Sequence, residues 1–217
     1  MNWTQEPVGA ELPTVVPAPR TSVERGSAGP LTGITSRGAA RFTRGGAPTP
    51  NLLLRAAVAR DAEPLRELIA GLSVRSAFMR FLAGVRHPSE RLLARLLQVD
   101  DSHGAHVAVA TDGRLVAHAM WAMQEESVEL GVVVADAWQG RGIGSALVRS
   151  ALTEAAVAGA CTVRMDVHVD NRRLARHLSR WPGVTADRDG DGEMLTFWAP
   201  MRASADGGSR AAGRLSR

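Results

Sequence analysis

The stretch from Val128 to Leu147, VELGVVVADAWQGRGIGSAL, constrains the fold more than any other part of the chain. Its first residues, 128–134, form a short apolar run typical of a strand, and a glycine-rich loop follows. The glycines at 140, 142 and 144 stand at alternate positions where a helix begins. Small residues there leave backbone N–H groups uncovered, and the positive end of the helix dipole points the same way. The stretch therefore predicts a strand–loop–helix unit that binds the phosphate of a cofactor.

The spacing of these glycines distinguishes between kinds of phosphate loop. A Walker A loop requires a lysine after its second glycine, and the chain contains no lysine. A dinucleotide fingerprint requires G-x-G-x-x-G, whereas Ser145 occupies the position of the last glycine. A glycine-rich turn that binds no ligand is the alternative, although glycine is costly inside a helix and needs a reason to be there.

The position of the loop after the strand adds specificity. The pattern Q-x-x-G-x-G, formed by Gln139, Gly142 and Gly144, resembles the acetyl-CoA loop of the GNAT acetyltransferase superfamily. The resemblance implies that backbone amides of the loop hold the pyrophosphate of coenzyme A. The residues expected to contact acetyl-CoA in this loop are Gln139, Gly140, Arg141, Gly142, Ile143, Gly144 and Ser145.

The resemblance extends to two other segments. It implies that backbone groups of Val132, Val133 and Val134 pair with the pantetheine arm as an added strand, one N–H polarising the thioester carbonyl. The segment from Asn171 to Leu178 resembles the family's second cofactor motif, in which Asn171 would hydrogen-bond the cofactor. Many family members have a tyrosine general acid at the position of Leu178. This chain contains no tyrosine, so water is the expected acid.

Composition divides the chain into three parts. Residues 1–50 are rich in Pro, Gly, Thr, Ser and Arg, and such a segment cannot bury enough apolar surface to offset its chain entropy. We expect a disordered leader over 1–50 and a disordered tail over 201–217; a partner-binding leader is the alternative. The middle part, 51–200, is expected to be one GNAT acetyltransferase domain.

The middle part predicts an α/β (α+β) fold. Asp61 and Ser89 are expected to cap the helices that they begin, and Asp112-Gly113 and 189–192 are expected hairpin turns. The expected strands are 52–57, 106–110, 115–121, 128–134, 162–169 and 194–198, and the expected helices are 61–70, 73–82, 89–99, 142–158 and 171–180. This order resembles the GNAT fold, a mixed, mostly antiparallel central sheet that is flanked by helices and splayed between its fourth and fifth strands.

The strand before the glycine loop carries a candidate general base. Side chains alternate along a strand, so Glu129, Gly131 and Val133 share one face. An amine must be deprotonated before it attacks a thioester, and a carboxylate beside an apolar tunnel can take that proton directly or through a water. We predict Glu129 as the base, and a Glu at this place has that role in GNAT proteins resembling bacterial protein-lysine acetyltransferases. An exposed glutamate on a solvated face is the alternative.

The stretch 76–100 bears on the acceptor. Its aromatic-Arg-Phe segment, leucine-rich helix and acidic end resemble the corresponding part of bacterial protein-lysine acetyltransferases, which implies a protein lysine as the acceptor. A small-molecule amine acceptor and a non-catalytic acyl-CoA-binding module are the alternatives. Two sets of polar residues either serve the acceptor or are ordinary polar surface: the acidic Asp100, Asp101, Glu125 and Glu126, and the strand residues Arg164, Asp166 and His168.

Composition also argues against other classes of protein. The net charge is +4 with arginines spread among acidic residues, so no nucleic-acid partner is expected. No run approaches ~18 consecutive apolar residues, so no membrane span is expected. The histidines lack metal-ligand spacing, so no metal is expected. The single cysteine, Cys161, precludes an intrachain disulfide, fits a cytoplasmic location and is expected to pack in the core.

Overall fold

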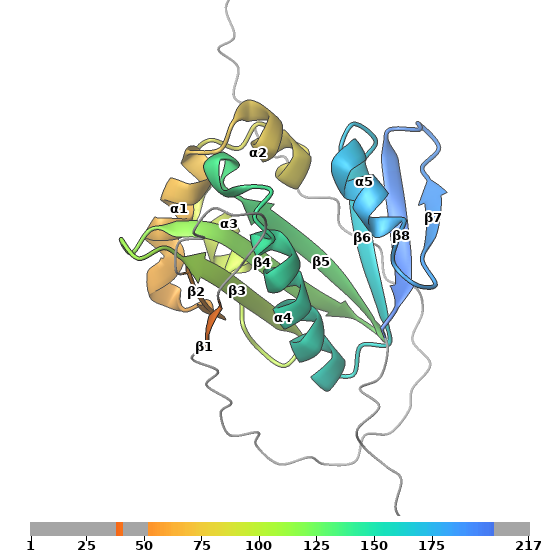
Figure 1. Cartoon of the computed structure of the whole chain (residues 1–217), viewed down its shortest axis with the longest axis horizontal. Coiled ribbons are helices and arrows are strands. Elements are labelled where there is room, and N and C mark those ends of the chain that lie inside the picture. Colours follow the sequence, from red (N-terminus) through yellow and green to blue (C-terminus); the bar gives the residue numbers. More distant parts are fainter. Residues whose placement is uncertain (1–37, 41–51, 202–217) are drawn as a thin grey trace, which may run out of the picture. The chain divides into compact units, whose positions relative to one another are not determined.

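Eight strands form one sheet in the computed structural model, which describes residues 38–40 and 52–201 (Figure 1). Along the sheet the strands follow the order β1-β2-β3-β4-β5-β6-β8-β7. Their bounds are β1 Gly38–Ala40, β2 Leu52–Ala56, β3 His103–Val109, β4 Leu115–Gln124, β5 Ser127–Val134, β6 Thr162–His168, β7 Thr185–Arg188 and β8 Met194–Pro200. The pairing of β5 with β6 is parallel and all other pairings are antiparallel, which confirms the mixed, mostly antiparallel sheet.

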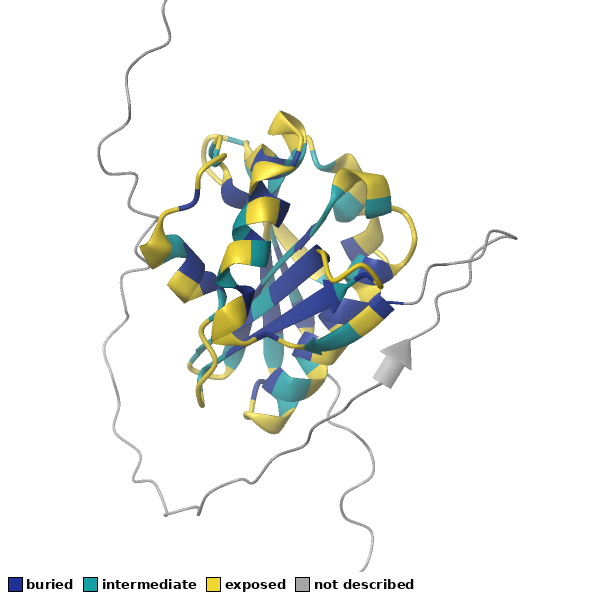
Figure 2. Ribbon diagram, turned by 90° about the vertical axis from the view of Figure 1, so that its left-hand side faces the viewer, coloured by how far each residue is buried: buried dark blue, intermediate teal, exposed yellow. Residues whose placement is uncertain are grey.

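Five α-helices cover the two faces of this sheet. They are α1 Ala62–Ala70, α2 Val74–Phe81, α3 Glu90–Leu96, α4 Ile143–Val157 and α5 Arg172–Leu178. Side chains of α1, α2 and α3 form one buried cluster with Val107, Leu115 and Val133 of the sheet. Side chains of α4 and α5 pack in clusters on the opposite face. Figure 2 shows the buried strands enclosed between these helices.

Short polar side chains explain where several helices begin. Ser73 and Ser89 accept hydrogen bonds from backbone N–H groups three residues later, which satisfies a donor that the helix itself leaves free. Asp61 stands at the N-cap position of α1, but the prediction that its side chain caps this helix is wrong, because the carboxylate accepts from the Val58 N–H at 2.9 Å and binds Arg55 at 2.6 Å instead. The Arg55 guanidinium is the stronger partner because its hydrogen bonds to a carboxylate are charge-assisted.

Both predicted hairpins are confirmed. Gly113 has φ +86°, a conformation that favours glycine, and it joins β3 to β4. The second hairpin joins β7 to β8. Several expected bounds and contacts differ from the structure, and β4 extends to Gln124 while α3 ends at Leu96. β3 begins at His103, three residues before the predicted start, and the core packing predicted for Cys161 is wrong because this residue is exposed and precedes β6.

Most of the expected disordered segments lie outside the described residues. Within residues 1–50 the structure describes β1, which pairs antiparallel with β2. The sequence predicts no strand there, and the pairing is explained by the free backbone edge that β2 presents.

The sheet opens between β5 and β6. These strands pair over three residues, from Ser127↔Thr162 to Glu129↔Arg164. Beyond this point they diverge toward α2 and α5 (Figure 1). The predicted splay between the fourth and fifth strands of the domain is therefore confirmed, at β5 and β6 once β1 is counted. The divergence leaves one edge of the second half of β5 without a partner among the described strands, and the candidate site lies there.

Candidate active site

The open edge of β5 presents backbone hydrogen-bonding groups to the gap. The Ala135 N–H donates to the Val116 carbonyl of β4 at 2.9 Å. Because backbone groups alternate in direction along a strand, those of Leu130, Val132 and Val134 point away from β4, toward the gap. Val133 has the opposite orientation, since it pairs with β4 and its side chain lies in the core. A ligand added along this edge would therefore meet the N–H and C=O of Val132 directly.

The glycine loop lies between the end of β5 and the start of α4. Gly140 and Gly142 have φ +77° and +82°, conformations that residues with a Cβ rarely adopt. Within the described residues, the N–H groups from residue 140 to residue 145 have no hydrogen-bond partner. These donors lie at the N-terminus of a 15-residue helix. Unpaired donors and the helix dipole together form a site suited to a phosphate group.

Side chains of the loop hold its shape. Gln139 Nε2 donates to the Val134 carbonyl at 3.0 Å and to Ser76 Oγ at 3.2 Å. Arg141 donates to the Ala137 carbonyl at 3.0 Å and lies over the Trp138 ring. Both side chains are engaged with the protein, so the loop offers a ligand mainly its backbone.

The segment before the loop is tied to α2. Asp136 accepts hydrogen bonds from the Ser73 N–H, Ser73 Oγ and Ser76 Oγ at 2.7 to 2.9 Å. Partial burial raises the pKa of Asp136, but these hydrogen bonds outweigh that effect and leave the pKa below its ordinary value. The N-terminus of α2 is thus fixed against the glycine loop.

The other wall of the gap comes from α5. Asn171 caps this helix, since its Oδ1 accepts from the Leu174 N–H at 3.3 Å. The Arg173 guanidinium lies beside the loop, 3.3 Å from the point where a Cβ on Gly140 would stand. Sequence reasoning missed Arg173, although its position two residues after Asn171 was a usable signal. Leu178 is buried in the core formed with β6 and β8, so the vacant general-acid position is filled by packing.

Glu129 lies where β5 and β6 separate. Its side chain is half-buried, and Oε2 accepts from Gln124 Nε2 at 3.0 Å. Its register partner across the parallel pairing is Arg164, on the same face of the sheet. The structure thus places the predicted base at the start of the gap, two residues before Gly131.

Arg80 of α2 occupies the space above Gly131. Its Nη2 lies 2.5 Å and its Cζ 2.8 Å from the point where a Cβ on Gly131 would stand. The Nε atom is buried and finds no acceptor among the described residues. Burial lowers the pKa of Arg80 to about 10, and the Glu129 carboxylate offsets only part of this lowering. A cationic side chain therefore lies against β5 beside the predicted base, which the sequence pattern did not indicate.

Residues of α2 also contact β6 and the turn that follows it. The Phe78 ring packs edge-on against His168 at 5.2 Å, and Arg75 donates to the Asp170 carbonyl at 3.1 Å. On β6, Arg164 pairs with Asp166 at 2.9 Å, and the Arg164 Nε is also buried without an acceptor among the described residues. The polar face of β6 therefore lines the same side of the gap as Glu129.

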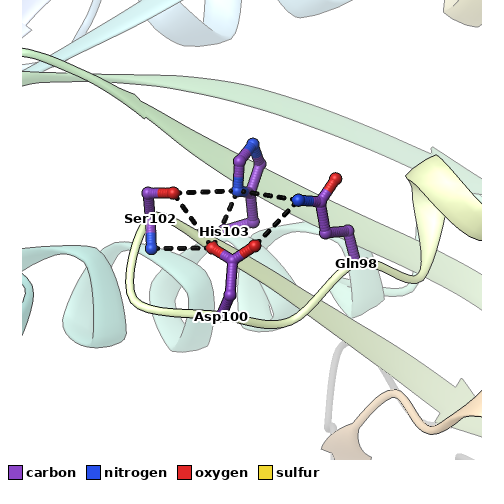
Figure 3. A network of polar contacts seen from close by, with 4 residues as sticks. All are labelled: Gln98, Asp100, Ser102 and His103. Atoms are coloured by element: carbon purple, nitrogen blue, oxygen red, sulfur yellow. Dashed lines mark hydrogen bonds and ion pairs between the residues drawn. The ribbon is translucent and has the colours of Figure 1, made fainter.

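Asp100 belongs to a turn outside this gap (Figure 3). Its carboxylate accepts from Gln98 Nε2, from Ser102 N–H and Oγ, and contacts His103 Nδ1. The hydrogen bond from Gln98, followed by those from His103 and Ser102, holds the pKa of Asp100 well below its ordinary value. Asp100 therefore stabilises the turn before β3, which favours the interpretation as ordinary surface for this residue.

The described part of the chain has neither a cluster of metal ligands nor a membrane-spanning helix. Among these residues, no three His, Cys, Asp or Glu side chains gather where they could hold a metal ion. None of the described helices is both long and apolar enough to cross a membrane.

Comparison with known proteins identifies the class. Residues 72–179 match the model of the acetyltransferase (GNAT) family. This range holds α2, the open strand β5, the glycine loop and α5. No match to a curated protein sequence was found.

Solved structures of the same fold include three acyltransferases. The GNAT domain of Streptomyces lividans PAT is 20% identical with a TM-score of 0.67, over 76% of this chain and 96% of that one. The cAMP-binding acyltransferase of Mycobacterium smegmatis is 22% identical with a TM-score of 0.52, over 77% of this chain and 48% of that one. The putative acetyltransferase yncA of Salmonella typhimurium, solved with acetyl-CoA, is 19% identical with a TM-score of 0.55, over 76% of this chain and 99% of that one.

These findings define the protein as an acyltransferase. The chain belongs to the GNAT acetyltransferase family, and acetyl-CoA is its acyl donor.

Proposed function

We propose that this enzyme transfers the acetyl group of acetyl-CoA to a primary amine, the side chain of a protein lysine, with Glu129 as the general base. One observation carries the proposal: the Glu129 carboxylate stands at the point where β5 leaves β6, on the face where Gly131 makes room for the Arg80 guanidinium. A base at this point lies beside the open edge along which a thioester would extend.

The backbone of β5 and the glycine loop would bind the donor. The N–H groups of residues 140–145 would hold its pyrophosphate, and the edge groups of Val132 would hold the pantetheine arm. Arg173 and Asn171 would close the other side, the arginine through a charge-assisted contact to phosphate.

Glu129 would then act on the acceptor. It removes a proton from the ammonium, and the neutral amine attacks the thioester carbonyl carbon. The C–N bond forms, the C–S bond breaks, and the thiolate takes a proton from water because no tyrosine is available. An N–H on the β5 edge would stabilise the oxyanion.

The surface of α2 favours a protein acceptor. Three apolar side chains on this helix and at its end are exposed: Val74, Phe78 and Leu82. Phe78 contacts His168 at the gap, so this apolar surface borders the entrance. A macromolecular acceptor can cover such a surface, whereas a small amine would leave it exposed. The proposed location is the cytoplasm, where the exposed Cys161 stays reduced.

Glu129→Gln tests the base. The amide keeps the size of the side chain but cannot accept the proton, so turnover should fall by about 10² to 10⁴ while acetyl-CoA affinity is unchanged. Glu67→Gln, on the exposed surface of α1, is the matched control and should retain full turnover. Equal turnover in Glu129→Gln and wild type would remove Glu129 from the mechanism.

The acceptor is tested separately. Release of free coenzyme A thiol is measured with lysine peptides, polyamines and free amino acids. Faster release with lysine peptides supports the protein acceptor, and faster release with a small amine supports the alternative.

A further inference from the structure

We infer that the Arg80 guanidinium sets the charge of the acceptor site, disfavouring an ammonium beside Glu129 and so favouring the neutral amine that attacks. This inference rests on the proposed function, because it concerns the amine from which Glu129 takes a proton.

The position of Arg80 is specific to this face of β5. Its guanidinium lies against the backbone at Gly131, where any larger residue would displace it. Glu129 is on the same face two residues away, roughly 7 Å along the strand. No ion pair within 4.0 Å joins Arg80 to any described residue. A cation with a buried, unpartnered Nε is costly to keep, and such groups concentrate at functional sites.

The neighbouring charges leave Arg80 and Glu129 as the pair that governs this site. On β4, burial lowers the pKa of His118 to about 3, so this residue is neutral. On β6, Arg164 is paired with Asp166, and His168 packs against Phe78. On α2 itself, Arg75 is directed to the Asp170 carbonyl. On η1 (Ala59–Asp61), the buried carboxylate of Asp61 is paired with Arg55 of β2.

The two charges have opposite effects on a cationic acceptor. Glu129 attracts the ammonium, and Arg80 opposes it. A fixed positive charge roughly 7 Å away, at an effective dielectric constant of about 20, lowers the pKa of an ammonium by about one to two units. The enzyme thus gives up some affinity for the charged acceptor in exchange for a larger neutral fraction near pH 7.

Arg80→Met and Arg80→Lys test this inference in the full-length enzyme, with Nα-acetyl-lysine amide as the acceptor probe. Met has a similar length and no charge, whereas Lys keeps the charge. In Arg80→Met we expect KM to fall several-fold, kcat at pH 7 to fall about tenfold, and the rising limb of the pH profile to move up by about one unit. Arg80→Lys should restore most of the wild-type profile. Arg91→Met, which removes an exposed arginine from α3, is the control and should leave the profile unchanged.

A purely structural role would give a different result. Arg80 lies over the Phe81 ring but forms no ion pair with a described residue, so the unfolding temperature of Arg80→Met should be unchanged or raised. Superimposable pH profiles of wild type and Arg80→Met, or a rise in KM, would overturn the inference.

A binding measurement separates this inference from the proposed base. By calorimetry, Arg80→Met should tighten binding of Nα-acetyl-lysine amide and leave the neutral Nα-acetyl-norleucine amide unchanged, whatever the turnover. Equal changes for both probes would overturn the charge effect. Persistent turnover in Glu129→Gln alongside the selective change would reject the base and keep Arg80.

Discussion

Gly131→Ala places a methyl group where the Arg80 guanidinium now lies. The new Cβ would stand 2.5 Å from Nη2 and 2.8 Å from Cζ of Arg80, so the guanidinium must move by about 1 Å to restore ordinary contact at 3.4 Å or more. Gly131 does not have a positive φ, so alanine brings no backbone strain. The cost arises from this one steric contact.

The loss of stability in Gly131→Ala depends on how easily the Arg80 guanidinium can move. Overpacking in a dense interior costs about 1 to 3 kcal/mol. The displaced atoms are the end of a flexible side chain, so we expect the low end of this range, about 1 kcal/mol of the free energy of unfolding. The effect on activity should be smaller, less than about twofold in kcat at pH 7, because moving a charge by about 1 Å at roughly 7 Å changes its interaction with the acceptor by only about 0.3 kcal/mol at an effective dielectric constant of about 20.

A double-mutant cycle measures the contact directly. Wild type, Gly131→Ala, Arg80→Met and the double variant are compared by urea denaturation and by acetyl transfer. In the Arg80→Met background Gly131→Ala should cost almost nothing, which gives a coupling free energy of about 1 kcal/mol. Gly84→Ala is the matched control, since a Cβ there meets no atom within 4 Å. If Gly131→Ala costs the same in both backgrounds, the steric contact with Arg80 does not operate.

Three further predictions concern the donor site and acid stability. Gly142→Asp should weaken acetyl-CoA binding at least tenfold by calorimetry, whereas Gly142→Asn, which tolerates positive φ without charge, should weaken it less; equal losses would argue against phosphate at this loop. Arg173→Gln should weaken acetyl-CoA about fivefold and reduce the salt dependence of binding, and an unchanged salt dependence would count against its contact with phosphate. Burial lowers the pKa of His118 from 6.5 to about 3, so its stabilisation is complete above pH 6.5 and is lost as the pH falls toward 3. Between pH 7 and 5 wild type should lose about 2 kcal/mol more than His118→Gln in urea denaturation, and equal losses would contradict this assignment.

The order of the elements was predictable because it depends on local pattern. Alternating apolar residues marked β5, and the serines at 73 and 89 were available as helix caps. The glycines at 140 and 142 signalled a backbone conformation that requires them. These signals lie within a few residues of the structure that they determine.

Errors arose where a competing side chain or a strand boundary decided the outcome. Asp61 was an expected cap, but Arg55 binds its carboxylate first. Cys161 was an expected core residue, but the strand begins one residue later and leaves it exposed. Neither outcome follows from the residues next to it in the chain.

The sequence alone determined the strand, the glycine loop and the helix behind it, because phosphate binding needs only a short run of backbone donors in one conformation. It also indicated Glu129 through the alternation of side chains along β5. The fold decided what stands opposite Glu129. It brought Arg80, from 51 residues earlier in the chain, against Gly131, and Arg173 against Gly140. Such pairs depend on how helices pack over the open sheet, and no local pattern records that packing.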